Sequence, residues 1–260
     1  MKIPIYQVDA FTNAVFGGNP AAVCPLTEWI DASLMQKIAM ENNLSETAFF
    51  VPKGNDFELR WFTPKLEINL AGHPTLATAH VIFEHLNYKN DIINFITMKS
   101  GILKASKKDG IIQLDFPGYD VKKIDAPEAL LNGLCAQPKE VFLGRDYFAV
   151  FEKESDVLAL EPDFRELAKL DCLGIIATAP GDKSDFVSRF FAPRAGINED
   201  PVTGSAHTLL IPYWAKRLDK NSLHAFQVSE RRGELFCEYH GERVFIGGRA
   251  VTFFVGDISL

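Results

Sequence analysis

A ten-residue block occurs twice in this chain, and no other feature constrains its fold as strongly. The copies are Arg60-Trp-Phe-Thr-Pro-Lys-Leu-Glu-Ile-Asn69 and Arg189-Phe-Phe-Ala-Pro-Arg-Ala-Gly-Ile-Asn198. Five of the ten positions are identical at one constant offset of 129 residues. The identical pairs are Arg60/Arg189, Phe62/Phe191, Pro64/Pro193, Ile68/Ile197 and Asn69/Asn198. Because self-similarity at a fixed spacing indicates a duplicated unit, we expect two similar domains.

The domain boundary is predicted at the strongest turn signal between the copies. The length of 260 residues allows one or two domains at roughly 150 residues each, and the repeat favours two. A long apolar strand pattern ends in the turn residues Phe116-Pro117-Gly118, which makes this the best linker. We therefore expect domains at 1–117 and 118–250. The C-terminal strand, about 251–260, is a candidate to return to the first domain.

The composition excludes several classes of protein. Apolar residues make up 47% of the chain and charged residues 23%, as in an average globular protein with a core in each half. A net charge of −7 argues against a nucleic-acid partner, because phosphate contacts need clustered Lys and Arg. No run approaches the roughly 18 apolar residues of a membrane span, and no export signal is visible. We expect a cytoplasmic protein with no membrane partner.

The cysteines and histidines give no metal signal. The four cysteines form no Cys-x-x-Cys pair, so packed, reduced thiols are expected at Cys24, Cys135, Cys172 and Cys237. His73, His80 and His85 resemble a metal cluster on paper, but Glu84 is the only carboxylate at a matching helical spacing. We expect no metal site.

Strand and helix patterns alternate in the same order in both halves. The first half contains strand patterns at 3–9, 21–24, 47–51, 57–62, 92–98, 102–106 and 111–116, and the second at 140–143, 147–151, 174–179, 186–191, 225–228, 235–239, 243–247 and 251–255. Helices are expected at 31–41, with Asp31 as N-cap, and at 74–85 and 205–217. The last two are mostly apolar, so we expect each to be buried among strands, with Pro212 kinking its helix or placed where the missing hydrogen bond is tolerated. The fold class is thus α+β, with two pseudo-symmetric domains, each a curved mixed sheet or barrel around a central helix.

A glycine precedes or begins each buried helix, at Gly72-His73 and at Gly204-Ser205. A helix N-terminus carries unpaired N–H groups and about half a positive charge, so such a turn suits a carboxylate ligand. The repeat leaves the register after Asn69 and Asn198 open, since an offset of 127 aligns His73 with Asp200, whereas an offset of 132 aligns Gly72 with Gly204. We favour 132. We expect the two N-termini to face each other across an interdomain cleft.

Glu46 is the candidate acid/base. It lies in Asn42-Asn-Leu-Ser-Glu-Thr47, at the junction of a helix and a strand, and its neighbours carry no charge. If it faces the cleft, partial desolvation would raise its pKa toward the working pH, as a proton-returning base requires. The alternative is an ordinary surface or capping carboxylate. For His73, Asp200 and Ser205 the alternatives are a turn histidine, a turn aspartate and a helix N-cap.

A series of motifs in fixed order resembles the PhzF-like (phenazine-biosynthesis) isomerases, which have the diaminopimelate epimerase fold. The series covers nearly the whole chain. It comprises Val8-Asp-Ala-Phe-Thr12, Phe16-Gly-Gly-Asn-Pro20, Asn43-Leu-Ser-Glu-Thr47, Arg60-Trp-Phe-Thr-Pro64, Ala71-Gly-His-Pro-Thr75, Arg189-Phe-Phe-Ala-Pro193 and Glu199-Asp-Pro-Val-Thr-Gly-Ser-Ala206.

The resemblance implies a cofactor-independent isomerase acting on a small carboxylate-bearing substrate, and typically a homodimer. Glu46 would shuttle a proton between carbons, with His73 and Asp200 as further catalytic residues. Substrate-binding positions implied are Gly72, Thr203, Gly204, Ser205 and Asn19. The related epimerases use two cysteines, each directly before a glycine, and Ala71 and Thr203 stand at those positions here. Two-thiol epimerisation is therefore not expected.

Two other functions remain open at this point. One is an amino-acid epimerase or racemase that pairs Glu46 with His73 or Asp200 across the reacting carbon. The other is a non-catalytic protein that binds a small carboxylate or a partner. A base on one face returns the proton to that face and gives a shift, whereas inversion needs groups on both faces.

Overall fold

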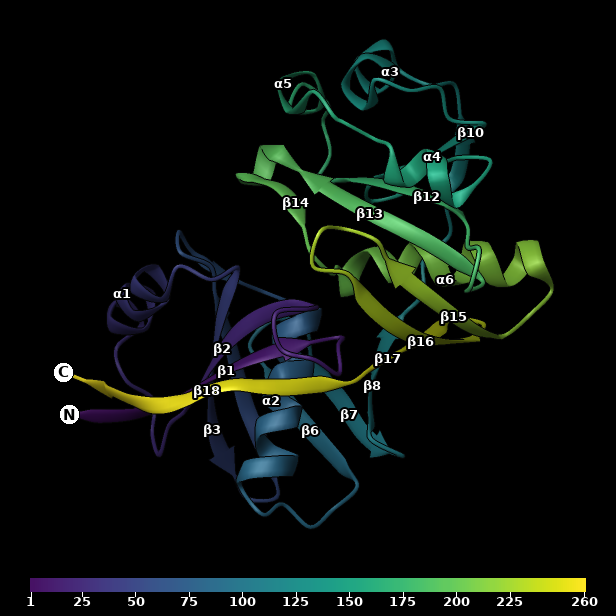
Figure 1. Cartoon of the computed structure of the whole chain (residues 1–260). Helices are drawn as coiled ribbons and strands as arrows, with labels where there is room; N and C mark the ends of the chain where they lie inside the picture. The colour runs from purple at the N-terminus through teal and green to yellow at the C-terminus, as the bar shows by residue number, and fades with distance from the viewer. The chain divides into compact units, whose positions relative to one another are not determined.

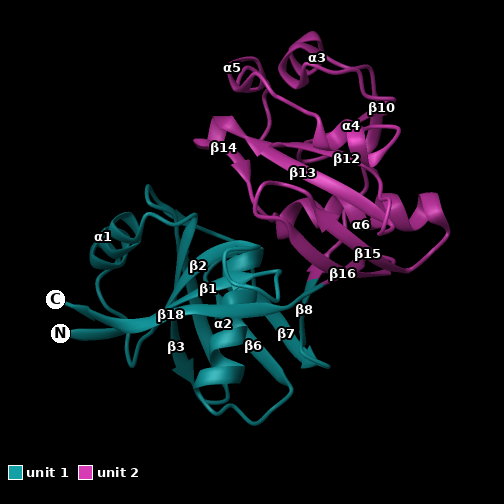
Figure 2. Ribbon diagram, in the orientation of Figure 1, with its two compact units in different colours: residues 1–115, 247–260 teal, residues 116–246 magenta.

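A computed structural model describes residues 1–260, and the chain divides into two units (Figure 1). Unit 1 comprises Met1–Asp115 with Gly247–Leu260, and unit 2 comprises Phe116–Ile246 (Figure 2). No helix is long and apolar enough to cross a membrane.

Unit 1 is a curved mixed sheet. Its strands are β1 Lys2–Ala10, β2 Asn19–Pro25, β3 Glu46–Lys53, β4 Asp56–Phe62, β5 Glu67–Ile68, β6 Ile92–Thr97, β7 Ile102–Lys108, β8 Ile111–Pro117 and β18 Ala250–Ser259. They pair in the order β18-β1-β2-β3-β4-β6-β7-β8, and the short β5 also pairs with β4. The pairs β2–β3 and β4–β6 are parallel and the others antiparallel.

Helix α2, Gly72–His85, is the central helix of unit 1. It packs against β1, β2, β3 and β18 (Figure 1). Most of its apolar side chains are fully buried, among them Leu76, Ala79 and Ile82. The prediction of a helix buried among strands is confirmed, because so little of its surface is polar that no face suits solvent.

Helix α1, Ala32–Asn42, covers a different face of the sheet. Its N-cap is Asp31, as predicted, and Asp31 Oδ1 accepts a hydrogen bond of 3.1 Å from the Ser33 amide. Met35 and Ile38 pack on Phe49 in a core separate from that around α2. The helix ends at Asn43, which adopts a left-handed conformation.

Unit 2 repeats the plan of unit 1. Its strands are β9 Lys122–Ile124, β10 Glu140–Leu143, β11 Tyr147–Val150, β12 Ile175–Pro180, β13 Phe186–Ala192, β14 Ile197–Asp200, β15 Ser222–Gln227, β16 Gly233–His240 and β17 Arg243–Gly248. Its helices are α3 Glu128–Leu134, α4 Glu154–Leu158, α5 Phe164–Leu167, the 3-10 turn η1 Pro193–Ala195 and α6 Gly204–Leu218. The sequence patterns missed β5, β9, β14, α3, α4, α5 and η1, all of seven residues or fewer, because such short segments carry too little periodicity.

The strand pairing of the two units matches ladder for ladder. In unit 2 the order is β9-β10-β11-β12-β13-β15-β16, with β14 on β13, and the pairs β11–β12 and β13–β15 are parallel. The strand after β8, β9, pairs with β10 of unit 2. The strand after β17, β18, pairs with β1 of unit 1 along its length. Each half of the chain thus ends in a strand that completes the other unit.

The register of the repeat differs from the sequence prediction at two of the five identical pairs. Trp61 pairs with Ile68 in unit 1, and the equivalent Phe190 pairs with Asp200 in unit 2. Ile68 is therefore equivalent to Asp200 and not to Ile197, and the match of Asn69 with Asn198 fails for the same reason. The hairpin of unit 2 is three residues longer, because it contains η1 and the left-handed Gly196. From that point the offset is 132, which agrees with helix starts at Gly72 and Gly204.

Pro212 lies in the interior of helix α6. Pro212 lacks the N–H that would bond the Thr208 carbonyl four residues earlier. The Tyr119 amide donates to that carbonyl instead, at 2.9 Å. The prediction that Pro212 lies where its missing bond is tolerated is confirmed, and the donor comes from the segment that follows β8.

Candidate active site

Three polar side chains predicted for the site meet at one end of unit 1. Asn19 begins β2 and Glu46 begins β3, and these two strands are parallel. The amino ends of parallel strands lie at the same end of a sheet, so Asn19 and Glu46 lie close to one another there. His73, in the first turn of α2, comes to the same place.

His73 joins the other two side chains. Its Nε2 lies 3.1 Å from Glu46 Oε2, and its Nδ1 lies 3.2 Å from Asn19 Nδ2. The side chains of His73 and Glu46 are only 6% and 13% exposed, and Asn19 is fully buried. The closest atoms of His73 and Glu46, Nε2 and Oε2, are both buried and form no hydrogen bond with each other.

Burial keeps the His73 ring neutral. It lowers the pKa of His73 to about 3, and a hydrogen bond to the Pro20 backbone opposes this only in part. A neutral imidazole carries one ring hydrogen, so His73 offers a donor at one nitrogen and an acceptor at the other. The group beside Glu46 is therefore a neutral imidazole and not a fixed positive charge.

The turn before Asn19 requires a glycine. Gly18 has φ +59, and a Cβ built there would lie 2.0 Å from the Ala10 carbonyl oxygen. Asp9 supports the same loop, since its Oδ2 accepts a 2.8 Å hydrogen bond from the Phe16 amide. The Gly-Gly-Asn motif is thus explained by the approach of the loop to β1.

The first turn of α2 has no side-chain cap, because its N-cap residue is Ala71. Gly72 begins the helix directly before His73. The Thr75 hydroxyl donates to the Ala71 carbonyl at 2.5 Å, which holds the start of the helix. A helix N-terminus without a capping side chain offers its N–H groups and its dipole to an anion.

Unit 2 groups the remaining predicted residues at the start of α6. The Thr203 hydroxyl donates to Asp200 Oδ2 at 2.5 Å. Thr203 is the N-cap by position and Gly204 begins the helix. Ser205 lies in the first turn and is partly exposed, so the alternative of Ser205 as N-cap is wrong. This helix start also lacks a side-chain cap bond.

Gln227, at the end of β15, fixes this loop and was missed by the sequence reasoning. Its Oε1 accepts from the Thr203 amide at 2.8 Å, and its Nε2 donates to the Asp200 carbonyl at 2.6 Å. The side chain is fully buried. Gln227 lies 24 residues beyond Thr203 along the chain, so no local pattern could have pointed to the contact.

His207 is a second residue that the sequence reasoning missed. It lies one turn into α6, and its Nδ1 is 2.9 Å from the Thr203 carbonyl oxygen. Burial lowers the pKa of His207 to about 4, so the ring is neutral near neutral pH. Its aromatic neighbour is Phe186.

The two units do not carry the same chemistry at equivalent positions. Thr47 pairs with Phe62 in unit 1 as Ile175 pairs with Phe191 in unit 2, so Gly174 is the equivalent of Glu46. Counted from the helix starts, Ser205 is the equivalent of His73. Unit 2 has no carboxylate–imidazole pair at this place.

The histidines of α2 do not gather into one cluster. His73 lies beside Glu46, whereas His80 Nε2 and His85 Nε2 lie 3.0 and 2.8 Å from the hydroxyl of Thr252 on β18. No group of three or more His, Cys, Asp and Glu side chains is arranged to hold a metal ion.

The four cysteines are free, and three of them are at least partly buried. Cys135 is exposed, so the prediction of a packed thiol is wrong there. It is the C-cap of α3 and has a left-handed backbone conformation. Burial raises the pKa of the Cys24 and Cys237 thiols far above the usual range.

Known proteins share this fold over the whole chain. A hydroxyproline epimerase from Agrobacterium vitis superposes with a TM-score of 0.63 at 10% identity, covering 100% of this chain and 93% of that one, which shows the fold alone. A PhzF-family phenazine biosynthesis protein from Enterococcus faecalis superposes with a TM-score of 0.98 at 49% identity, with both chains fully covered. An uncharacterized isomerase of Pseudomonas aeruginosa is 47% identical over 260 residues, again with both chains fully covered.

The protein has the diaminopimelate epimerase fold, which is shared by PhzF proteins and by epimerases of small molecules. The family model for phenazine biosynthesis-like proteins, PhzC-PhzF, matches residues 8–256. The chain belongs to this family, whose relatives include proteins named isomerases. The resemblance read from the motifs is confirmed.

Proposed function

We propose that this protein is a cofactor-independent isomerase that moves a proton between carbons of a small carboxylate-bearing substrate, with Glu46 as acid and base. The observation that carries the proposal is the contact of 3.1 Å between Glu46 Oε2 and His73 Nε2 at the uncapped start of α2. A carboxylate held this way has a defined orientation and a polar partner, yet it keeps a second oxygen for a substrate proton.

The start of α2 supplies the electrostatic part of the proposal. Removing a proton from carbon builds negative charge beside the substrate carboxylate. The N–H groups and the dipole of the first helical turn stabilise such charge without reorganising. Gly72 has no side chain to keep a ligand from this backbone.

His73 is assigned a role that keeps Glu46 in its working geometry. Its Nε2 lies 3.1 Å from Glu46 Oε2, and its Nδ1 is held by Asn19, so the ring limits where the carboxylate can move. When Glu46 takes a proton from the substrate and returns it, His73 keeps its single ring hydrogen, and no proton passes between the two side chains. Because His73 is neutral, it adds no charge that would hold Glu46 permanently ionised.

The arrangement favours a shift over inversion by Glu46 and His73. Inversion needs one group on each face of the reacting carbon, and two groups whose nearest atoms are 3.1 Å apart leave no room for a carbon between them. The absence of a carboxylate at Gly174 supports a single acid/base. We assign Asp200, Thr203, Gly204 and Ser205 to substrate binding. Asp200 as a second proton donor stays a prediction.

The test is Glu46→Gln, followed by exchange of carbon-bound hydrogen in D2O against a panel of small carboxylates by NMR. The amide keeps the size of the side chain but cannot take a proton. We expect ligand affinity within a small factor of the parent and proton exchange slower by roughly 10²-fold or more. Glu41→Gln, at an exposed position of α1, is the matched control and should exchange at the parental rate.

Each outcome separates one function from the others. Deuterium at a new carbon without inversion supports the isomerase. Label with inversion at one carbon would support an epimerase instead. Binding without any exchange would indicate a non-catalytic carboxylate-binding protein. If Glu46→Gln exchanges protons as fast as the parent, Glu46 is not the base.

A further inference from the structure

The buried amide of Gln227 spans the loop from Asp200 to Thr203, and only one orientation of this amide fits. Its Oε1 accepts from the Thr203 amide at 2.8 Å, and its Nε2 donates to the Asp200 carbonyl at 2.6 Å. Turning the amide over would set a donor against a donor and an acceptor against an acceptor. The first and last residues of the loop are therefore joined by one side chain.

The second hydrogen of Gln227 Nε2 is directed at the Thr203 hydroxyl. Nε2 lies 3.3 Å from Thr203 Oγ1, and the same hydroxyl donates to Asp200 Oδ2 at 2.5 Å. A hydroxyl has one hydrogen, so an oxygen that accepts from Gln227 is left to donate to the carboxylate. Amide, hydroxyl and carboxylate form a chain in which each hydrogen bond strengthens the next. The direction of the Asp200 carboxylate is therefore set from Gln227.

Packing also holds the backbone of this loop. Val202, within the loop, is fully buried. It packs against Gly233, the partner of Gln227 in the β15–β16 ladder, and a Cβ at Gly233 would lie 2.3 Å from Val202 Cγ2. The loop backbone is thus fixed by packing as well as by Gln227, whereas the hydrogen-bond chain acts on the Asp200 side chain.

Unit 1 has a different residue at the position of Gln227. Leu59 and Ser188 are equivalent in the repeat, and Leu59 pairs with Thr97 as Ser188 pairs with Gln227. Thr97 is therefore the equivalent of Gln227. Its hydroxyl donates to the Gly101 carbonyl at 2.8 Å, within its own turn, and so does not hold the loop before α2.

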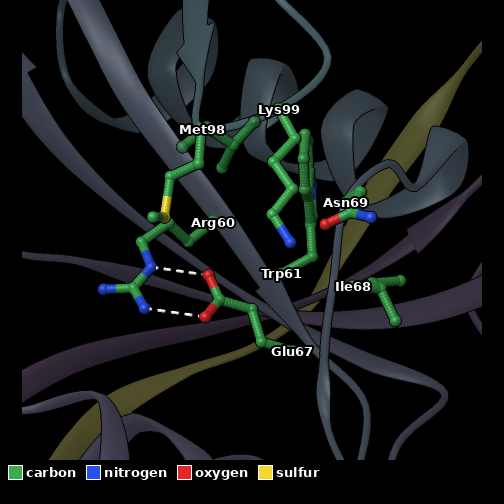
Figure 3. A pocket seen from close by; sticks show the side chains of 8 residues that line it. Arg60, Trp61, Glu67, Ile68, Asn69, Met98 and Lys99 are labelled. Atoms are coloured by element: carbon green, nitrogen blue, oxygen red, sulfur yellow. Dashed lines mark hydrogen bonds and ion pairs between the residues drawn. The ribbon is translucent and has the colours of Figure 1, made fainter.

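The two segments that Gln227 helps to join in unit 2 line a cavity in unit 1. Ile68 and Lys99, the equivalents of Asp200 and Ser229, line this cavity of about 130 Å³ (Figure 3). In unit 2 the Ser229 hydroxyl instead donates to the Asp200 carbonyl at 3.4 Å, and it lies 3.5 Å from Gln227 Nε2. The network is therefore a property of unit 2, the unit that carries Asp200.

We propose that Gln227 is a positioning residue for substrate binding, which fixes the direction of the Asp200 carboxylate through the Thr203 hydroxyl. The proposal rests on the proposed function in taking Asp200 as a substrate-binding residue. Gln227 itself does not touch the substrate, because its side chain is fully buried. A carboxylate that is already held in one direction loses less conformational freedom when the substrate binds. Gln227 thus contributes to affinity and not to proton transfer.

The first test is the side-chain rotamer of Asp200, measured in the whole protein by NMR from the three-bond couplings to its carboxyl carbon. Gln227→Met keeps the length of the side chain but has no amide. We expect one Asp200 rotamer in the parent and averaging among rotamers in Gln227→Met. Thr203→Val should show the same averaging, and Thr203→Ser, which keeps the hydroxyl, should show the parental couplings. Gln137→Met makes the matched exchange at an exposed position of unit 2 and should leave the couplings unchanged.

The second test separates affinity from turnover in the D2O exchange reaction, with the panel carboxylate that the parent protein exchanges. Gln227→Met should raise KM by about tenfold and keep kcat within about threefold, which is the pattern of a lost binding contact. Glu46→Gln should show the opposite pattern. Gln227→Met combined with Thr203→Val should bind no more weakly than Thr203→Val alone, because both changes break one chain.

Thr203→Val leaves the backbone bonds of Gln227 in place, so it decides the proposal even if Gln227→Met does not fold. A single parental Asp200 rotamer in Thr203→Val, or averaging in the parent itself, would overturn the proposal. A parental KM in folded Gln227→Met would overturn it as well. The rotamer is measured without substrate, so this result stands whether or not Glu46 proves to be the base.

Discussion

Mild acid should destabilise this protein through histidines that are neutral in the fold. Burial lowers the pKa of His207 and of His80 to about 4, and that of His73 to about 3. The unfolded chain has the ordinary value of 6.5. Between these values the unfolded state binds more protons than the folded state, so stability falls as the pH drops from about 6.5 toward about 4.

His207 gives the cleanest magnitude because its surroundings carry no ion pair. With pKa values of about 4 folded and 6.5 unfolded, the free energy of unfolding should fall by about 2 kcal/mol between about pH 7 and about pH 5 from this side chain alone. That is a sizeable part of the roughly 5–15 kcal/mol that usually separates folded from unfolded proteins.

The assay is urea unfolding at the two pH values for the parent and for His207→Gln. The glutamine can still donate to the Thr203 carbonyl but does not titrate, so the variant should lose about 2 kcal/mol less than the parent on acidification. His240→Gln removes an exposed histidine and should show the parental loss. If His207→Gln loses as much stability as the parent, the buried ring is not the cause and the reasoning fails.

Two further outcomes follow from the packing of unit 2 and from the thiols. Gly174→Ala would place a Cβ 2.1 Å from the Phe190 ring, so urea unfolding should show a loss of about 1–3 kcal/mol, and an unchanged midpoint would show that the ring yields freely. Iodoacetamide should label Cys135 in the folded protein and leave Cys24 and Cys237 unlabelled until unfolding, as mass spectrometry would show, and parental proton exchange after labelling would argue against a cysteine mechanism.

The sequence predicted the long elements because their patterns are local. The alternation of apolar residues along β7 and β8 and the apolar stretch of α2 can be read without knowing their partners. The repeat was equally readable, but its register was wrong after Pro64 and Pro193. Ile197 and Asn198 are the same residue types as Ile68 and Asn69, so the sequence comparison aligned them. The strand pairing shows instead that three residues are inserted before this point in unit 2.

The insertion also hid an equivalent contact. Arg60 and Arg189 align in the sequence, yet their partners Glu67 and Glu199 do not, because the longer hairpin of unit 2 lies between arginine and glutamate. The same bidentate geometry in both units shows that the pairs are related. A fixed-offset comparison cannot find a pair whose two members lie on opposite sides of an insertion.

The candidate site was predicted residue by residue but not as a geometry. Glu46 and His73 were identified by motif, and their contact depends on how β3 and α2 pack, which no local spacing encodes. The sequence did not point to Gln227 or His207 for the same reason, since each of them makes a hydrogen bond to the backbone of Thr203. Side chains that bond the backbone of a remote loop leave no pattern in the sequence.

The difference between the two units is fixed by packing and not by one residue. The equivalent of Glu46 in unit 2 is Gly174, and any side chain there would enter the space of the Phe190 ring. Restoring a carboxylate at Gly174 would therefore require a smaller residue at 190 as well, so the second copy cannot regain the acid/base by a single substitution.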